Sequence, residues 1–260
     1  MKGLAVTPQP IILEQLVNMS HYLGDPARPY AILGEGNTSA RIDDDSFFIK
    51  ASGTTLATMK PDDFLPVSIS RVIAVLDNPA ADDAVVAEAL RNALLKPEEK
   101  RMPSVETVLH AVLYQYPDIH FIGHCHPEAI NMLMCSVRAQ EAALGRLCPD
   151  HIVVVGRSSV YVPYTDPGLQ LARAIRKLVR DYIEREHELP KSIYLQNHGF
   201  FALGATPKTV CNIFDMAEKM ARILVGAYSA GGPRFMPEAD INRIHTRPDE
   251  HYRQKLLSLK

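Results

Sequence analysis

Short apolar runs alternate with longer amphipathic segments along this chain, and this alternation restricts its fold more than any other feature. Residues 120–126, 192–196 and 200–204 have the length and composition of strands. Residues 169–186 and 206–228 repeat apolar side chains at helical spacing, and Thr206-Pro207 is a typical helix start. Such alternation predicts an α/β or α+β layer fold.

The remaining segments fit the same plan. Residues 39–52 read as two short strands around the acidic turn DDDS, so we expect a hairpin and a largely antiparallel or mixed sheet. Further strands are predicted at 66–70 and 151–155. Further helices are predicted after Thr7-Pro8, over 82–95, from Ser104, and over 127–136. The loose stretch AGGPRFMP near residue 230 separates a main domain, residues 1–230, from a tail, residues 231–260. We expect the tail to pack on the same domain or on a neighbouring subunit.

Charge and composition exclude several classes of function. The formal net charge is −2 and the basic residues are spread along the chain, so we expect no nucleic-acid partner. No apolar stretch approaches the roughly 18 residues of a membrane span, so we expect no membrane partner. The four cysteines show no C-x-x-C spacing and suit reduced thiols, which predicts a cytoplasmic protein.

Three histidines are candidate metal ligands. In the predicted strand, the period of two places His124 and His126 on one face and Cys125 on the other. The alternative is two hydrogen-bonded histidines at a strand end, because chance alone gives roughly 0.4 such pairs in a chain of this composition. His198 lies in an Asn-His-Gly turn, where glycine lets the backbone approach a site closely. Three imidazoles would leave the fourth position of a tetrahedral zinc open for catalysis.

A carboxylate and two small-residue turns complete the candidate chemistry. Glu106 lies in the first turn of a predicted helix; it is either an ordinary acid near the helix dipole or an acid/base beside the metal. Residues 34–39 and 51–55 offer backbone N–H groups and hydroxyls that can cradle a phosphate. They are equally typical of plain strand connections. The other histidines, including His110 and His120, are predicted to be surface or core residues.

Taken together, these stretches resemble the class II aldolase/adducin family over roughly residues 10–228. The resemblance rests on an ordered set of motifs: GEGNTSARI, FFIKASGTTL, PSVETVLHA, GHCHPEA and NHGFFALG. Within the family, the chain is most similar to the aldolase portion of the rhamnulose-1-phosphate aldolase/alcohol dehydrogenase fusions. The resemblance implies a three-layer α/β/α fold around a mostly antiparallel central sheet, and a homotetramer.

The resemblance also assigns roles to particular residues. It implies a metal triad of His124, His126 and His198, with Glu106 as the catalytic carboxylate. It implies Zn²⁺ as the cofactor, with Mn²⁺ or Co²⁺ as alternatives. The implied phosphate pocket has four members: Asn37, Ser52, Gly53 and Ser104. Where family aldolases often carry two hydroxyl residues before the glutamate, this chain has Ser104 and then Val105. Tyr252, in the tail, is a candidate for the tyrosine that protonates the leaving oxygen in related aldolases.

The implied activity is cleavage of a ketose phosphate to an aldehyde and dihydroxyacetone phosphate through a metal-stabilised enediolate. The partner is therefore a small sugar phosphate. Three alternatives within the family use similar chemistry: a sugar-phosphate 4-epimerase, a sugar-acid phosphate decarboxylase and a dehydratase. Related epimerases tend to carry aspartate at the position of Glu106, which favours cleavage. The alternative outside enzymology is an adducin-like structural module, which has the same fold without the metal site.

Overall fold

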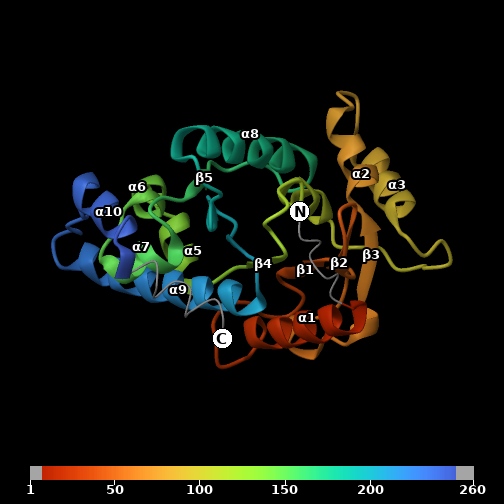
Figure 1. Cartoon of the computed structure of the whole chain (residues 1–260), viewed down its shortest axis with the longest axis horizontal. Coiled ribbons are helices and arrows are strands. Elements are labelled where there is room, and N and C mark those ends of the chain that lie inside the picture. The colour runs from red at the N-terminus through yellow and green to blue at the C-terminus, as the bar shows by residue number, and fades with distance from the viewer. Residues whose placement is uncertain (1–7, 250–260) are drawn as a thin grey trace.

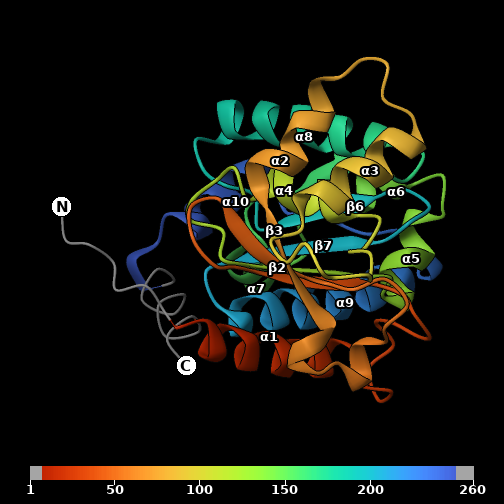
Figure 2. The same cartoon turned by 90° about the vertical axis from the view of Figure 1, so that its right-hand side faces the viewer.

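A seven-stranded sheet lies between two layers of helices in the computed structural model, which describes residues 8–249 (Figures 1 and 2). The strand order is β3-β2-β1-β4-β7-β6-β5. The strands are β1 (Asn37–Arg41), β2 (Ser46–Lys50), β3 (Phe64–Ser68), β4 (Phe121–Cys125), β5 (Val160–Val162), β6 (Ser192–Leu195) and β7 (Phe200–Gly204). Neighbouring strands are antiparallel except for the parallel pair β5 and β6. The predicted three-layer α/β/α fold around a mostly antiparallel sheet is therefore confirmed.

Each face of the sheet carries its own helices and its own apolar core (Figure 2). One face is covered by α2 (Ile69–Ile73), α3 (Asp83–Ala93), α4 (Thr107–Leu113) and α8 (Leu169–Glu186). The core on the other side takes residues from α1 (Gln9–Leu23), α5 (Glu128–Met134), α6 (Ala139–Leu144), α7 (Pro149–Val155) and α9 (Pro207–Ser229). Short 3₁₀ turns occupy Leu56–Thr58, Pro61–Asp63 and Ala74–Asp77. No helix between residues 8 and 249 has the length and apolar character needed to cross a membrane.

Strand β7 is apolar throughout because both of its faces are covered. In β7, Phe201 and Leu203 belong to the core beneath α4 and α8, whereas Phe200 and Ala202 belong to the opposite core. The alternation follows from the period of two along a strand. A strand buried on both faces therefore reads as a continuous apolar run in the sequence.

The strand predicted at residues 151–155 is wrong, because this segment belongs to helix α7. A short continuous apolar run is typical of either a buried strand or a buried helix, and its β-branched content favours the strand. Pro149 favours the helix, since its fixed φ and missing N–H suit the first turn of a helix. Most of α7 is buried, so it lacks the polar face that would identify it in the sequence.

Two other predicted boundaries move by a few residues. The strand predicted at 66–70 is β3, which ends at Ser68 where α2 begins. The helix predicted from Ser104 begins at Thr107, so Glu106 stands just before its first residue.

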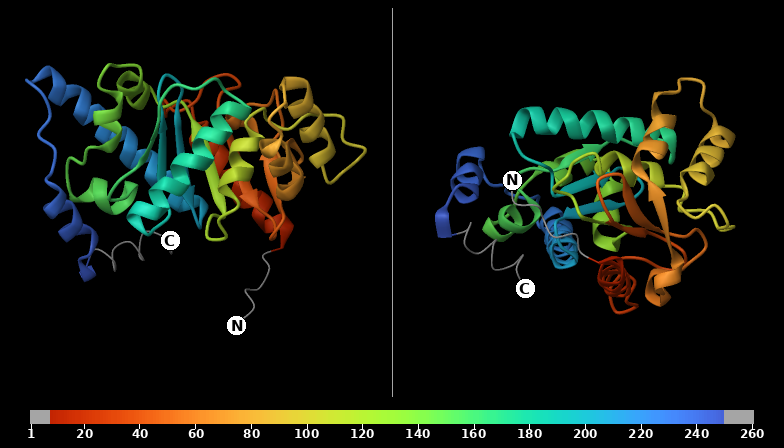
Figure 3. Two further views of the ribbon diagram at one scale, coloured as in Figure 1. Left: turned by 90° about the horizontal axis from the view of Figure 1, so that it is seen from above. Right: turned by 45° about the vertical axis from the view of Figure 1, so that its right-hand side comes forward.

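The first helix of the tail is α10 (Glu238–His245), which packs against α7 of the same chain (Figure 3). Ile244 of α10 contacts the buried Ile152 and Val153. The division of the chain at residue 230 stays a prediction. Tyr252 lies outside the described residues.

Candidate metal and acid–base site

Three histidine side chains converge at one end of the central strands. His124 is in β4, His126 follows that strand directly, and His198 lies in the turn between β6 and β7. Because β4 and β7 pair antiparallel, with His124 opposite Phe201, the turn before β7 lies beside the end of β4. One ligand atom from each histidine lies within 4.8 Å of the others. Within residues 8–249 these side chains form the one such group of potential metal ligands.

The hydrogen bond of His124 fixes which of its ring nitrogens can bind a metal. Its Nδ1 lies 3.1 Å from the carbonyl oxygen of Phe200, which can only accept, so Nδ1–H donates. Burial lowers the pKa of His124 to about 3, so the ring is neutral near pH 7. Its Nε2 therefore carries a free lone pair. A hydrogen bond of this kind, from the ring nitrogen that does not bind the metal, orients a metal-binding imidazole.

The spacing of the donor atoms fits a small divalent ion. The Nε2 atoms of His124 and His126 are 3.3 Å apart. Two ligands on a tetrahedral zinc with bonds of about 2.0–2.1 Å are separated by about 3.3–3.4 Å. Glu106 has one oxygen 3.2 Å from His124 Nε2 and the other 3.1 Å from His198 Nε2. At His124, whose Nε2 presents a lone pair, the approach of the carboxylate is repulsive unless a cation or a proton lies between the two atoms, so this donor set fits a metal.

Glu106 is held as a buried carboxylate. Its side chain enters from the residue that precedes α4, and Asn37 Nδ2 donates a hydrogen bond of 2.6 Å to Glu106 Oε2. Burial raises the pKa of this carboxyl, but His124, His198 and the Asn37 amide lower it more, so the net pKa lies below its ordinary value. The group is thus ionised near neutral pH and can accept a proton.

The polar residues predicted from sequence line one cavity. Its volume is about 300 Å³, and its walls include Asn37, Ser52, Gly53 and Ser104 together with Glu106. His126 and His198 also line it, and the fully buried His124 lies behind them. The structure thus brings the eight predicted site residues together, while their individual roles stay predictions.

Two further charged side chains reach this cavity and were not predicted from sequence. Lys50 is only 3% exposed, and its Nζ lies 3.4 Å from the carbonyl oxygen of Gly34. Burial lowers its pKa, which the charge of Glu106 partly offsets. Glu35 has a carboxylate oxygen 3.8 Å from His126 Nδ1. The signal for Lys50 was a lone lysine in an apolar strand, directly before a small-residue turn.

His110 and His120 are outside the metal triad. His110 is buried and hydrogen-bonded to Asn37 Oδ1. His120 lines a different cavity, which is formed with residues such as Ile12 and Pro207.

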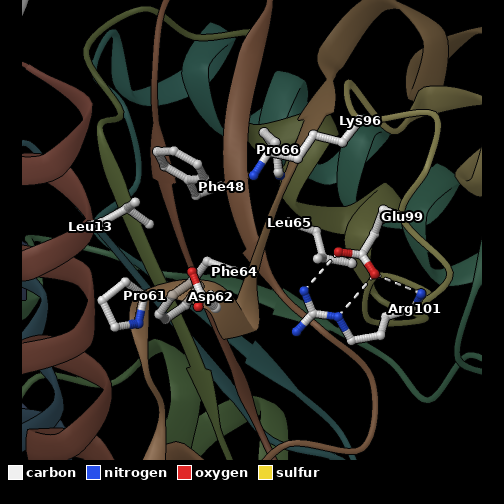
Figure 4. A pocket seen from close by; sticks show the side chains of 10 residues that line it. All are labelled: Leu13, Phe48, Pro61, Asp62, Phe64, Leu65, Pro66, Lys96, Glu99 and Arg101. Atoms are coloured by element: carbon white, nitrogen blue, oxygen red, sulfur yellow. Dashed lines mark hydrogen bonds and ion pairs between the residues drawn. The ribbon is translucent and has the colours of Figure 1, made fainter.

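A separate pocket of about 230 Å³ lies beside the edge strand β3 (Figure 4). Phe48, Phe64 and Leu13 form part of its wall, and Glu99 and Arg101 stand across from them. Arg101 Nη2 lies 2.7 Å from Glu99 Oε2, and this pairing lowers the pKa of Glu99 to about 2. The two charges thus satisfy each other and are not aimed at a ligand, unlike the groups around Glu106.

Comparison with known proteins identifies relatives along nearly the whole chain. Residues 14–225 match the family described as Class II Aldolase and Adducin N-terminal domain. The uncharacterized oxidoreductase YuxG of Bacillus subtilis is 27% identical over 86% of this chain, which spans only 32% of that protein. Methylthioribulose-1-phosphate dehydratase of Microcystis aeruginosa is 25% identical over 74% of this chain and 85% of its own length. The 3-oxo-tetronate 4-phosphate decarboxylase of Haemophilus influenzae is 24% identical over 85% and 90%.

Solved structures have the same fold. The N-terminal class II aldolase domain of a Thermoplasma acidophilum protein matches with a TM-score of 0.65 and 25% identity, over 86% of this chain and 99% of that one. An L-fuculose 1-phosphate aldolase matches with a TM-score of 0.66 and 20% identity, over 90% and 94%. At that identity the second likeness concerns the fold alone.

Proposed function

The chain belongs to the class II aldolase and adducin family, and we propose that it is a metal-dependent aldolase that cleaves a ketose phosphate to an aldehyde and dihydroxyacetone phosphate. One observation carries the proposal. The Glu106 carboxylate lies within 3.2 Å of the ligand atoms of His124 and His198, in a cavity lined by small polar residues. An ionised base beside a Lewis acid suits proton transfer at a carbon next to a carbonyl group.

The residues of the site divide the work of the reaction. His124, His126 and His198 would hold the metal, preferably zinc, with manganese or cobalt as alternatives. When bound, a divalent ion supplies positive charge that stabilises the negative charge developing on the carbonyl oxygen. Glu106 takes the proton from the carbon next to the carbonyl in the synthesis direction and returns it during cleavage. Asn37 keeps the Glu106 carboxylate in place through the 2.6 Å hydrogen bond.

The phosphate is proposed to lie between the two small-residue turns. Ser52, Gly53 and Ser104 line this part of the cavity with hydroxyl and backbone donors, and Lys50 adds a buried positive charge nearby. Val105 also lines the cavity and contributes no side-chain donor. The Lys50 ammonium therefore supplies part of the hydrogen bonding to the phosphate that a second hydroxyl at position 105 would provide.

The leaving oxygen needs a group that exchanges its proton, and Tyr164 is our candidate among the described residues. It follows β5 at the same end of the sheet as the metal ligands, and the nearby Pro167 lines the cavity. Tyr164 is 57% exposed, so it is free to meet a substrate or a neighbouring subunit. Its hydroxyl donates to Asp166, which raises the pKa of Tyr164 and keeps it protonated near neutral pH, so that in the synthesis direction it can give a proton to the aldehyde oxygen and in cleavage its phenolate takes that proton back.

A product assay tests the proposal and separates it from its alternatives. The purified chain, with its metal content measured, would be incubated with a panel of ketose 1-phosphates while dihydroxyacetone phosphate is monitored. Release of dihydroxyacetone phosphate that depends on metal and is lost in Glu106→Gln supports the aldolase. The panel would also include a thio-sugar phosphate and a 3-oxo sugar-acid phosphate, because a dehydratase and a decarboxylase are among the relatives. Turnover of either one alone would overturn the aldolase assignment.

The same preparation tests the non-enzymatic alternative. A stoichiometric divalent ion, retained through purification, agrees with the enzyme. A stable chain that binds no divalent ion even when one is supplied would indicate an adducin-like module instead.

A further inference from the structure

A buried chain of hydrogen bonds leads from Glu106 away from the cavity to Tyr114, whose hydroxyl also lies 3.4 Å from the carbonyl oxygen of His120. Asn37 Nδ2 lies 2.6 Å from Glu106 Oε2, and Asn37 Oδ1 lies 2.5 Å from His110 Nε2. The other ring nitrogen, His110 Nδ1, is 2.6 Å from Ser39 Oγ. Ser39 Oγ in turn is 2.8 Å from the hydroxyl of Tyr114. All five side chains are buried.

The chemistry of Glu106 sets the direction of every hydrogen bond in this chain. An ionised carboxylate only accepts, so the Asn37 amide must turn its nitrogen toward Glu106 and its oxygen toward His110. His110 must then donate from Nε2, which leaves Nδ1 to accept from the Ser39 hydroxyl. Ser39, having given its proton, accepts from Tyr114. Burial lowers the pKa of His110 to about 3, in agreement with a neutral ring that has one donor and one acceptor.

We propose that His110 is a positioning residue, which fixes the orientation of the Asn37 amide and through it the place of the Glu106 carboxylate. The two ends of an amide are nearly equal in size, so packing alone does not distinguish them. Glu106 and the Nε2–H of His110 distinguish them together, because the carboxylate requires the amide nitrogen on one side and the Nε2–H requires the amide oxygen on the other. The catalytic part of this proposal rests on the proposed function, whereas the orientation of Asn37 does not.

The sequence places these groups together through two simple periods. Glu106 and His110 are four residues apart at the start of α4, so both side chains face the same way. Asn37 and Ser39 are two residues apart on β1 and share the face of the sheet that α4 covers. Asn37 is also directly opposite His124 in the pairing of β1 with β4. This chain of hydrogen bonds therefore connects Glu106, which contacts the proposed metal ligands, with the core beneath α4.

Two substitutions of His110 separate its two hydrogen bonds. In His110→Gln the side-chain nitrogen can reach the position of Nε2 and still donate to Asn37. In His110→Asn the shorter amide reaches only the position of Nδ1, so it keeps Ser39 as a partner and loses Asn37. Crystal structures of both variants would show the contact between Asn37 and Glu106. Steady-state kinetics would follow kcat and KM with the ketose phosphate identified in the product assay.

We expect His110→Gln to keep the Asn37 to Glu106 contact and a kcat within a few-fold of the original. We expect His110→Asn to open that contact and lower kcat about 100-fold with little change in KM, the size of loss that follows a misplacement of about 1 Å. In an Asn37→Ala background, His110→Asn should cause no further loss, because His110 acts through Asn37.

Two outcomes would overturn the proposal. One is an intact contact between Asn37 and Glu106 in the His110→Asn structure. The other is an undiminished effect of His110→Asn in the Asn37→Ala background. If no substrate in the panel is turned over, the proposed function fails, and the crystal structures still decide the role of His110.

A second substitution at the same position keeps the test valid if His110→Asn does not fold. His110→Phe keeps a ring of similar size and removes the Nε2–H that donates to Asn37. We expect the same change in the Asn37 to Glu106 contact and a similar loss of kcat, about 100-fold. An unchanged contact in this variant would count against the proposal in the same way.

Discussion

Gly199 is predicted to be the residue that lets the third histidine approach the other two, so that Gly199→Ala should weaken metal binding. It follows His198 and is buried against the end of β4. A Cβ at this position would lie 2.7 Å from the Cys125 carbonyl oxygen, 2.7 Å from His126 Cδ2 and 3.0 Å from His124 Cε1. No ordinary carbon contact is that short.

The size of the effect follows from these distances. Relief of the closest contacts requires a movement of about 0.7 Å, because ordinary contact begins near 3.4 Å. Metal–ligand distances tolerate only about 0.2 Å. If the imidazole rings move to relieve the contact, His124 or His126 is displaced from its metal-binding position. If the turn that holds Gly199 moves instead, His198 is displaced with that turn. Either movement weakens one of three ligands, so we expect an affinity loss of about 100-fold, equivalent to about 2.8 kcal/mol.

Competition with a chromophoric zinc chelator would measure this loss, and elemental analysis would give the metal content per chain. Gly226→Ala is the matched control, since a Cβ there meets no atom within 4 Å and the position lies inside α9. The control should bind zinc normally and gain about 0.5–1 kcal/mol of helix stability. A Gly199→Ala protein with the zinc affinity of the original chain would refute the reasoning, because the rings would then not need this close approach.

Three further predictions test other parts of the molecule. Lys50→Met should raise KM for a phosphorylated substrate about 10-fold without lowering the melting temperature, because no carboxylate between residues 8 and 249 lies within ion-pair distance of the buried ammonium; a lower melting temperature with unchanged KM would contradict it. Glu218→Ala should cost about 2 kcal/mol in a denaturant titration, since the carboxylate accepts from the N–H groups of Ala129 and Ile130 at the start of α5; an unchanged midpoint would contradict it. Burial raises the pKa of Asp45, but hydrogen bonds from Ser68 and Ser70 lower it more, so the pKa of Asp45 is lower in the folded than in the unfolded protein. Ionised Asp45 should therefore stabilise the fold at pH values above its unfolded pKa, and this stabilisation should disappear as the pH falls through its folded pKa. Unfolding curves should therefore show Asp45→Asn as less stable than the original near neutral pH and equal to it in strong acid, and a constant difference would contradict this.

Periodicity in the sequence predicts most of the fold because the amphipathic elements bury only one face. The long helices α8 and α9 carry clear polar and apolar faces, and the acidic turn at 43–45 connects the hairpin strands as expected. Prediction fails at α7, where burial on nearly all sides removes the helical signature. The pairing of β5 with β6, which is the one parallel pair among the described strands, also could not be inferred, because it depends on the crossover through α8.

The site is predictable only in part, for a related reason. His124 and His126 can be recognised in the sequence as a pair because the period of two along a strand places both side chains on one face. Their proximity to His198 depends on the pairing of β4 with β7, which joins segments far apart in the sequence. His110 appears in the sequence as one more core residue of an apolar helix, and Lys50 as the polar end of a strand. Their relation to Glu106 emerges only when β1, β2 and α4 are packed together.

The position of the ligands explains how one family can hold different reactions. His124 and Asn37 are on adjacent central strands, and Glu106 is anchored at the start of a buried helix, so the proposed metal ligand His124 and the proposed base Glu106 are fixed by the core. The remaining walls of the cavity come from connecting segments, such as residues 34–36, 52–53 and 167. Connecting segments tolerate substitution far better than central strands. We propose that changes there alter which bond of a sugar phosphate is broken while the proposed metal ligands and base stay the same, in line with relatives named as a dehydratase and a decarboxylase. Substitutions that redirect the reaction should therefore fall in these segments, and those that abolish it should fall on β1, β4 and α4.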